Sequence, residues 1–149
     1  MKDTTKDTMG TAMKIREVMT PAPVTVARTD MVTAAADAMK EYGIGAVLVI
    51  ADGRLTGILT DRDIAIRVLA ESRDPATVRA GDVCSADLVA VGVDDDVADA
   101  IRAMSERAVR RVPVVDDGVP VGILSIGDVA LTWDERSALA EVSSAPPNT

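Results

Sequence analysis

An internal repeat is the feature of this sequence that most constrains its fold. Shifting the chain by 65 residues aligns residues 18–65 with 83–130 without a gap, and 18 of the 48 aligned positions are identical. A shared preference for helix or strand does not keep two segments in register through two turns. The chain therefore contains two copies of one structural unit. The identical pairs include Val24 with Val89, Val26 with Val91, Asp30 with Asp95, Gly57 with Gly122 and Asp63 with Asp128.

Each copy predicts the order strand, helix, strand, strand, helix. A continuous apolar run at 46–50 indicates a strand buried on both faces, and Asp52-Gly53 is typical of a hairpin turn. Asp30 is the expected N-cap of the first helix, which Gly43 ends. The expected elements of the first copy are an extended piece at 24–26, a helix at 32–42, strands at 46–50 and 55–59, and a helix from Thr60 to about residue 70.

The second copy repeats this order, with Asp95 or Asp94 as the expected cap of its first helix. Its final helix is expected to run past Trp133, a core or dimer-interface residue, toward position 142. Its elements are a helix at 97–106, strands at 112–115 and 119–124 around an Asp117-Gly118 turn, and a helix from 126; a short helical piece at 78–83 matches 13–18.

The repeat implies an α+β fold. One copy of about 60 residues has too little interior to be stable alone. We therefore expect two β-α-β-β-α repeats packed sheet to sheet about a pseudo-twofold axis, with two related clefts between them. The expected division is an N-terminal tail at 1–13, repeats at 14–72 and 73–142, and a C-terminal tail at 143–149.

Composition and charge exclude several classes of function. The net charge of −8 and the pI of about 4.5 disfavour binding to nucleic acid and to anionic membranes. The apolar runs are far shorter than the roughly 20 residues of a membrane span, and the N-terminus has no signal-peptide core. We expect a cytoplasmic protein without a nucleic-acid or membrane partner.

The chain lacks the residues of the common catalytic and metal sites. It has no histidine and a single cysteine, Cys84, which excludes an intrachain disulfide, Ser-His-Asp catalysis and the usual zinc sites. Three consecutive acids at 94–96 are expected to serve a helix start rather than a metal ion. We expect no enzymatic activity, no metal and no required cofactor.

Two strand-to-helix junctions carry the candidate chemistry. Both have the form Gly, two apolar residues, Thr or Ser, two variable residues and Asp, at 57–63 and 122–128. Free amides at a helix start favour a phosphate, the hydroxyl of Thr60 or Ser125 can donate to it, and Asp63 or Asp128 can accept from ribose hydroxyls. Gly57 and Gly122 are expected to admit the ligand to the backbone. The alternative is a capping box, which stabilises a helix without a ligand.

Three segments of the first copy, at 18–26, 43–49 and 57–63, and two of the second, at 109–115 and 122–128, strongly resemble the CBS (cystathionine-β-synthase) domain family. The resemblance covers about residues 14–141 and implies a tandem CBS pair, or Bateman module. Such modules typically bind AMP, ADP, ATP or S-adenosylmethionine and often form homodimers. The layout is similar to that of small stand-alone bacterial CBS proteins, including stress and dormancy types of actinobacteria.

The resemblance also implies a set of ligand-binding residues. Gly45 and Ala46 replace arginines of the family pattern, and Asp61 adds negative charge that Arg62 can offset, so the two clefts are not expected to be equivalent. The implied residues are Thr60, Arg62 and Asp63 in the first cleft, Ser125 and Asp128 in the second, Arg110 and Arg111 for phosphate, and Val24, Val26, Val47, Val89, Val91 and Val112 around the base.

These observations predict a ligand-sensing regulatory module that binds an adenosine-type nucleotide and signals to a partner. The partner is an unidentified effector protein, since no segment of the chain resembles an effector domain. The alternative is a structural or interaction dimer whose ligand clefts are vestigial.

Overall fold

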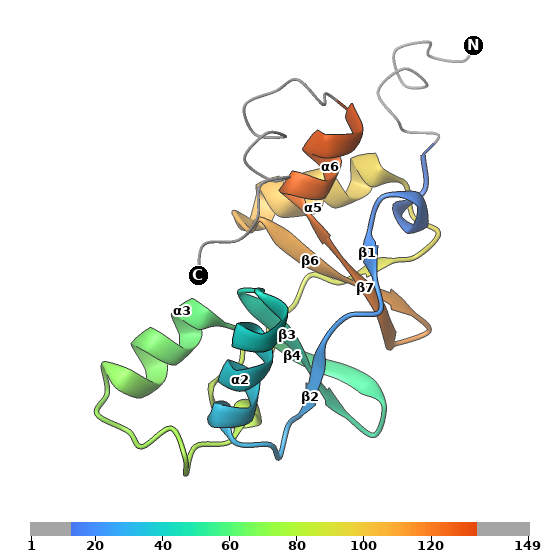
Figure 1. Ribbon diagram of the computed structural model, residues 1–149. Coiled ribbons are helices and arrows are strands. Elements are labelled where there is room, and N and C mark those ends of the chain that lie inside the picture. The colour runs from blue at the N-terminus through green and yellow to red at the C-terminus, as the bar shows by residue number, and fades with distance from the viewer. Residues whose placement is uncertain (1–12, 134–149) are drawn as a thin grey trace, which may run out of the picture. The chain divides into compact units, whose positions relative to one another are not determined.

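The computed structural model describes residues 13–133, which form two compact units (Figure 1). The first unit comprises residues 23–88 and 118–120 and thus holds most of the first copy. The second unit combines residues 13–22 with 89–117 and 121–133 and holds the second copy. Both units contain a sheet and helices, which confirms the α+β class.

The first unit is built on a three-stranded sheet. Strand β3 (Ala46–Ala51) lies between β2 (Thr25–Ala27), to which it is parallel, and β4 (Arg54–Thr60), to which it is antiparallel. Residues 46–49 are all buried, as expected of a strand covered on both faces. The helices are α2 (Val32–Tyr42), α3 (Asp61–Ile64), a π-helical turn η2 (Ala65–Leu69) that continues α3, and α4 (Ala80–Val83).

The second unit has a four-stranded sheet in the order β1 (Thr20–Pro21), β7 (Val119–Ser125), β6 (Arg111–Asp116), β5 (Val91–Gly92). Its helices are η1 (Ile15–Glu17, 3-10), α5 (Val97–Arg107) and α6 (Ile126–Trp133). Its core joins α5 and the sheet to Ile15, which is completely buried. The N-terminal segment thus supplies core of the second copy.

The leading segment of each copy packs on the other copy. Thr20 pairs with Ile123 of β7, and the equivalent Ser85 pairs with Ile58 of β4. The Ile15 amide also donates to the Asp95 carbonyl at 2.9 Å. Each unit is therefore assembled from segments that are separated in the sequence, and the division of the chain at residues 72 and 73 stays a prediction about the repeats.

The strand and turn predictions are confirmed, but the predicted caps of α2 and α5 are wrong. Asp30 accepts from the Ala27 amide at 2.9 Å, so it closes the turn before the helix. Asp95 does the same with the Gly92 amide at 2.7 Å. The first amides of both helices need no side-chain cap, because they donate to backbone carbonyls of distant segments: Val32 to Val78 and Val97 to Met13.

The predicted hairpins have the expected backbone: φ is positive at Asp52 and Gly53 and again at Asp117 and Gly118. The continuation of α6 beyond Trp133, the environment of the Trp133 side chain and the predicted tails beyond residues 13–133 lie outside the described residues. Within residues 13–133, every helix is too short or too polar to cross a membrane.

Candidate functional site

Both strand-to-helix junctions form a complete capping box. At the first junction the Thr60 amide donates to Asp63 Oδ2 at 2.9 Å, and the Asp63 amide donates to the Thr60 hydroxyl at 3.1 Å. At the second, the Ser125 amide donates to Asp128 Oδ2 at 2.9 Å and the Asp128 amide to the Ser125 hydroxyl at 3.0 Å. These bonds stabilise the helix starts without a ligand.

The second oxygen of each carboxylate takes no part in the cap. Asp63 Oδ1 lies 3.8 Å from Arg67 Nε, and Arg67 also donates to the Val83 carbonyl at 3.0 Å. Asp128 Oδ1 is 3.5 Å from the Thr20 hydroxyl. Because a carboxylate has about four lone-pair sites, both outer oxygens keep capacity to accept from a ribose hydroxyl. Each junction therefore combines a structural bond with a carboxylate oxygen that can still accept a hydrogen bond.

Arg67 and Thr20 are site neighbours that do not belong to the set of residues expected from the sequence. Arg67 lies four residues after Asp63, a spacing that brings charged side chains together on a helix and provides a signal for this pair. Thr20 is 108 residues from Asp128, and no local pattern predicts their contact.

The expectation of free amides at the first helix start is wrong. The Asp61 amide donates to the Gly45 carbonyl at 3.0 Å, and the Arg62 amide donates to Asp61 Oδ1 at 2.8 Å. At the second junction the Ile126 amide likewise donates to the Arg110 carbonyl at 2.9 Å. The Gly127 amide, however, has no acceptor among residues 13–133. The two junctions therefore differ in what they offer an anion.

The two glycines of the motif serve strand packing. A Cβ on Gly57 would lie 2.5 Å from Cys84 Sγ, and a Cβ on Gly122 would lie 2.6 Å from Met19 Sδ and 2.8 Å from the Thr20 carbonyl. The leading segment of the other copy thus occupies the space where the sequence analysis expected a ligand to approach the backbone. That expectation is wrong for both positions.

The predicted base-binding valines differ in burial. Val26 and Val47 pack in the core of the first unit, and Val91 and Val112 pack in that of the second, with Val47 and Val112 fully buried. These four side chains leave little or no surface for a base. Val24 and Val89 are only partly buried at the margins of the two cores, so for them a contact with a base stays a prediction.

The predicted arginines lie on the surface. Arg62 is exposed at the first helix start, and Arg110 and Arg111 are exposed at the start of β6. None of the three has an ion-pair partner among the described residues. Their charge is therefore available to an anion.

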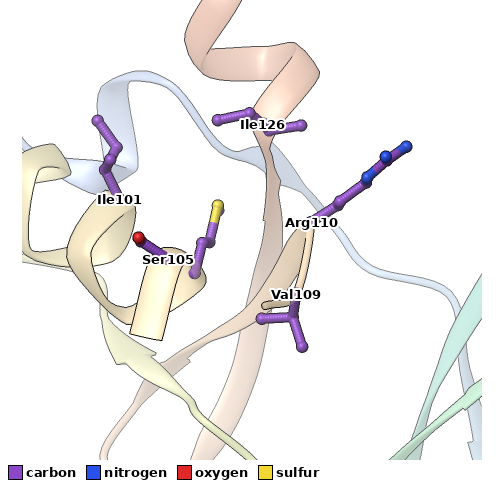
Figure 2. A pocket seen from close by; sticks show the side chains of 6 residues that line it. Ile101, Ser105, Val109, Arg110 and Ile126 are labelled. Atoms are coloured by element: carbon purple, nitrogen blue, oxygen red, sulfur yellow. The ribbon is translucent and has the colours of Figure 1, made fainter. Parts of the chain in front are cut away.

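The second unit also has an open cavity of about 420 Å³ between α5, the start of β6 and the start of α6. Of the predicted ligand residues only Arg110 lines it, and in Figure 2 the Arg110 side chain extends away from Ile101 and Ser105. The cavity is mainly apolar, and its lining residues are Ile101, Met104, Ser105, Val109, Arg110 and Ile126.

The three acids at 94–96 attach the N-terminal segment. Arg16 pairs with Asp94 at 2.6 Å and Lys14 with Asp96 at 3.0 Å, and the pKa of Lys14 is raised by its hydrogen bond to Asp96. No group of three or more Asp, Glu, Cys or His side chains within residues 13–133 is placed to hold a metal ion. With no histidine in the whole chain, the donor set does not fit the common zinc sites.

Comparison with known proteins agrees with the duplicated fold. The CBS domain family model matches residues 15–70 and 80–132. The CBS domain-containing protein YhcV of Bacillus subtilis is 38% identical over 133 residues, covering 87% of this chain and 94% of that protein. Hypoxic response protein 1 of Mycobacterium tuberculosis is 38% identical over 130 residues, covering 87% and 91%.

Solved structures share the fold of this chain. A crystal structure of Hypoxic Response Protein I with two coordinated zinc ions has a TM-score of 0.74 and 37% identity, covering 79% of this chain and 97% of that one. A CBS domain pair in complex with 5′-methylthioadenosine and S-adenosyl-L-methionine has a TM-score of 0.74 at 23% identity, covering 84% and 98%. With two family matches that span most of its length, this chain belongs to the CBS domain family and is a tandem CBS protein.

Proposed function

We propose that the protein is a non-catalytic regulatory module that binds an adenosine-type nucleotide at its strand-to-helix junctions and signals to a partner protein. AMP, ADP, ATP and S-adenosylmethionine are the candidate ligands. A cytoplasmic location and a part in a stress response belong to the same proposal, which the likeness to a hypoxic response protein supports.

The observation that carries the proposal is the divided use of each junction carboxylate. One oxygen of Asp63 and of Asp128 holds the helix start, and the other has only a long contact with its neighbour. A carboxylate fixed in this way presents an acceptor without losing further side-chain freedom when a ribose binds. A protein of the same fold has been solved with adenosyl compounds, which supports this class of ligand.

Thermal unfolding with each candidate ligand tests the proposal. A ligand at 100 times its dissociation constant stabilises the folded state by about 2.7 kcal/mol. Asp63→Asn and Asp128→Asn are the informative variants, because an amide oxygen can still accept from the backbone amide while the NH₂ group cannot accept from a ribose. We expect the variants to fold as the wild type does and to lose the ligand-dependent shift.

Alanine at these positions is a less specific control, since it also removes the cap and costs about 1 kcal/mol. If none of the four ligands raises the melting temperature of the wild type, the alternative of a structural or interaction module is correct. The complete capping boxes favour that alternative, because they need no ligand.

We also propose a homodimer. Ile66 and Leu69 lie one turn apart on η2, and half or more of each is exposed, as is Tyr42 at the end of α2. Adjacent exposed apolar side chains mark a surface that a partner can cover. Sedimentation equilibrium should show a dimer that Ile66→Glu with Leu69→Glu dissociates. The exposed pair Thr33→Glu with Asp37→Lys, in the first half of α2, is a control that should leave the dimer intact.

A further inference from the structure

The residue after the capping hydroxyl distinguishes the two junctions. It is Asp61 in the first copy and Ile126 in the second. Asp61 Oδ1 accepts from the Arg62 amide at 2.8 Å, whereas an isoleucine has no acceptor and leaves the equivalent Gly127 amide without a partner among the described residues. At the first helix start, the carboxylate of Asp61 therefore already occupies the Arg62 amide. The equivalent amide of the second helix start, that of Gly127, is available to a ligand.

The other amides of the first helix start are also engaged. Asp61 donates to the Gly45 carbonyl at 3.0 Å, and Asp63 donates to the Thr60 hydroxyl at 3.1 Å. A phosphate at this junction would have to displace the Asp61 carboxylate and then lie beside it. Two like charges about 4 Å apart repel strongly even at the effective dielectric constant of a protein surface.

Charge separates the junctions in the same direction. The first has two carboxylates, Asp61 and Asp63, against two cations, Arg62 and Arg67, and Arg67 already lies 3.8 Å from Asp63 Oδ1. The strand beside it begins at Ala46, after Gly45, where the second copy has two arginines. The second has the carboxylate Asp128 against Arg110 and Arg111 at the start of β6. Both arginines are exposed and lack an ion-pair partner among residues 13–133, so their charge is not neutralised locally.

We propose that Asp61 closes the first junction to phosphate, so that a phosphate-bearing adenosine nucleotide binds at the second junction alone. This inference rests on the proposed function and adds to it which junction takes the phosphate. Asp63 Oδ1 still accepts at the first junction, which therefore suits an adenosyl compound without a phosphate. Asp61 is a specificity-determining residue, and the two copies respond to different ligands.

Calorimetric titration of the full chain with AMP tests the proposal. We expect one AMP bound per chain, with binding retained in Asp63→Asn and lost in Asp128→Asn. Asp61→Ala should add a second AMP-binding event, at the first junction. The AMP affinity of that junction should be at least ten times higher in the variant than in the wild type. That event should disappear again in the double variant Asp61→Ala with Asp63→Asn.

Three further variants separate charge from occupation of the amide. Asp61→Asn removes the charge but keeps an oxygen for the Arg62 amide, so AMP should bind the first junction with intermediate affinity. Ile126→Asp should weaken AMP binding at the second junction tenfold or more. Asp37→Ala removes an exposed carboxylate from α2 and should leave AMP binding unchanged. Adenosine, which has no phosphate, should bind Asp61→Ala and the wild type equally.

Each result decides between the two ideas. Two AMP molecules on the wild type, one lost in each Asp→Asn variant, would overturn the role of Asp61 and leave the proposed function standing. The same holds if Asp61→Ala adds no second event. Absence of AMP binding in the wild type and in Asp61→Ala would overturn both the nucleotide-binding proposal for AMP and the inference built on it.

Discussion

Arg16 binds Asp94 through two of its N–H groups, with Nε at 2.9 Å and Nη2 at 2.6 Å from the same carboxylate oxygen, although 78 residues separate the two positions in the sequence. This ion pair lies beside the buried Ile15 and joins the N-terminal segment to the second copy. The attachment thus has an exposed ionic part and a buried apolar part.

The buried part should dominate the stability of this attachment. Ile15→Ala leaves a cavity in the second core and should lower the free energy of unfolding by about 2–5 kcal/mol. Arg16→Ala removes an exposed ion pair and should lower it by less than about 1 kcal/mol. Urea denaturation of the two variants measures the difference; equal effects would show that the ion pair holds the segment.

The end of α5 offers a stabilising substitution. Ala108 adopts a left-handed backbone with φ of 53°, where the first copy has Gly43 with φ of 63°. An alanine in this region is strained by about 1–2 kcal/mol, part of which glycine recovers. Ala108→Gly should raise the free energy of unfolding by about 1 kcal/mol and Gly43→Ala should lower it by a similar amount, as chemical denaturation can measure. A loss of stability in Ala108→Gly would contradict this account.

The two motif glycines should respond differently to a methyl group. A Cβ on Gly57 would lie 2.5 Å from Cys84 Sγ and 3.0 Å from the Ser85 carbonyl, whereas a Cβ on Gly122 would lie closer to a backbone carbonyl, that of Thr20, at 2.8 Å. Both alanine substitutions should destabilise by about 1–3 kcal/mol. Adding Cys84→Ala to Gly57→Ala should restore part of the stability. Adding Met19→Ala to Gly122→Ala should restore less, because the backbone carbonyl that remains there is closer, at 2.8 Å instead of 3.0 Å. Thermal unfolding of the four variants tests the order.

Cys84 should report its burial through the pH dependence of its reactivity. Burial raises the pKa of the Cys84 thiol above its ordinary value. Because the thiolate is the reactive form, the labelling rate should rise at higher pH than for a free cysteine thiol, and unfolding in urea should remove the difference. The folded state favours the neutral thiol. The contribution of Cys84 to the free energy of unfolding is therefore present below the ordinary thiol pKa, and it is lost as the pH rises through the pKa that Cys84 has in the folded state. Iodoacetamide labelling is unambiguous because the chain has one cysteine.

Local patterns predicted most of the elements of the fold. The repeat, the buried run at 46–50 and the two Asp-Gly turns placed the strands correctly, because each depends on residues close in sequence. The caps of α2 and α5 could not be predicted in this way, because carbonyls of Val78 and Met13 satisfy the first helix amides. A side chain that resembles a cap then closes a turn instead, as Asp30 does.

The site was predictable in its residue types but not in its details. The Thr/Ser-x-x-Asp pattern predicts either a capping box or a ligand site. The structure confirms the capping box in both copies, and the ligand site stays a prediction. The sequence could not show which copy the segment around Thr20 packs on, since similar strands are present in both copies. The contact of Thr20 with Asp128 follows from that packing alone.

The exchange of leading segments has a consequence for how such a chain can arise. A single ancestral repeat would have carried a strand that its own sheet did not use, and two separate molecules could have satisfied each other by trading that strand, as in domain swapping. Gene fusion would then have turned an exchange between molecules into an exchange along one polypeptide. Each half of the present chain, taken alone, therefore lacks the leading segment that pairs with its own sheet.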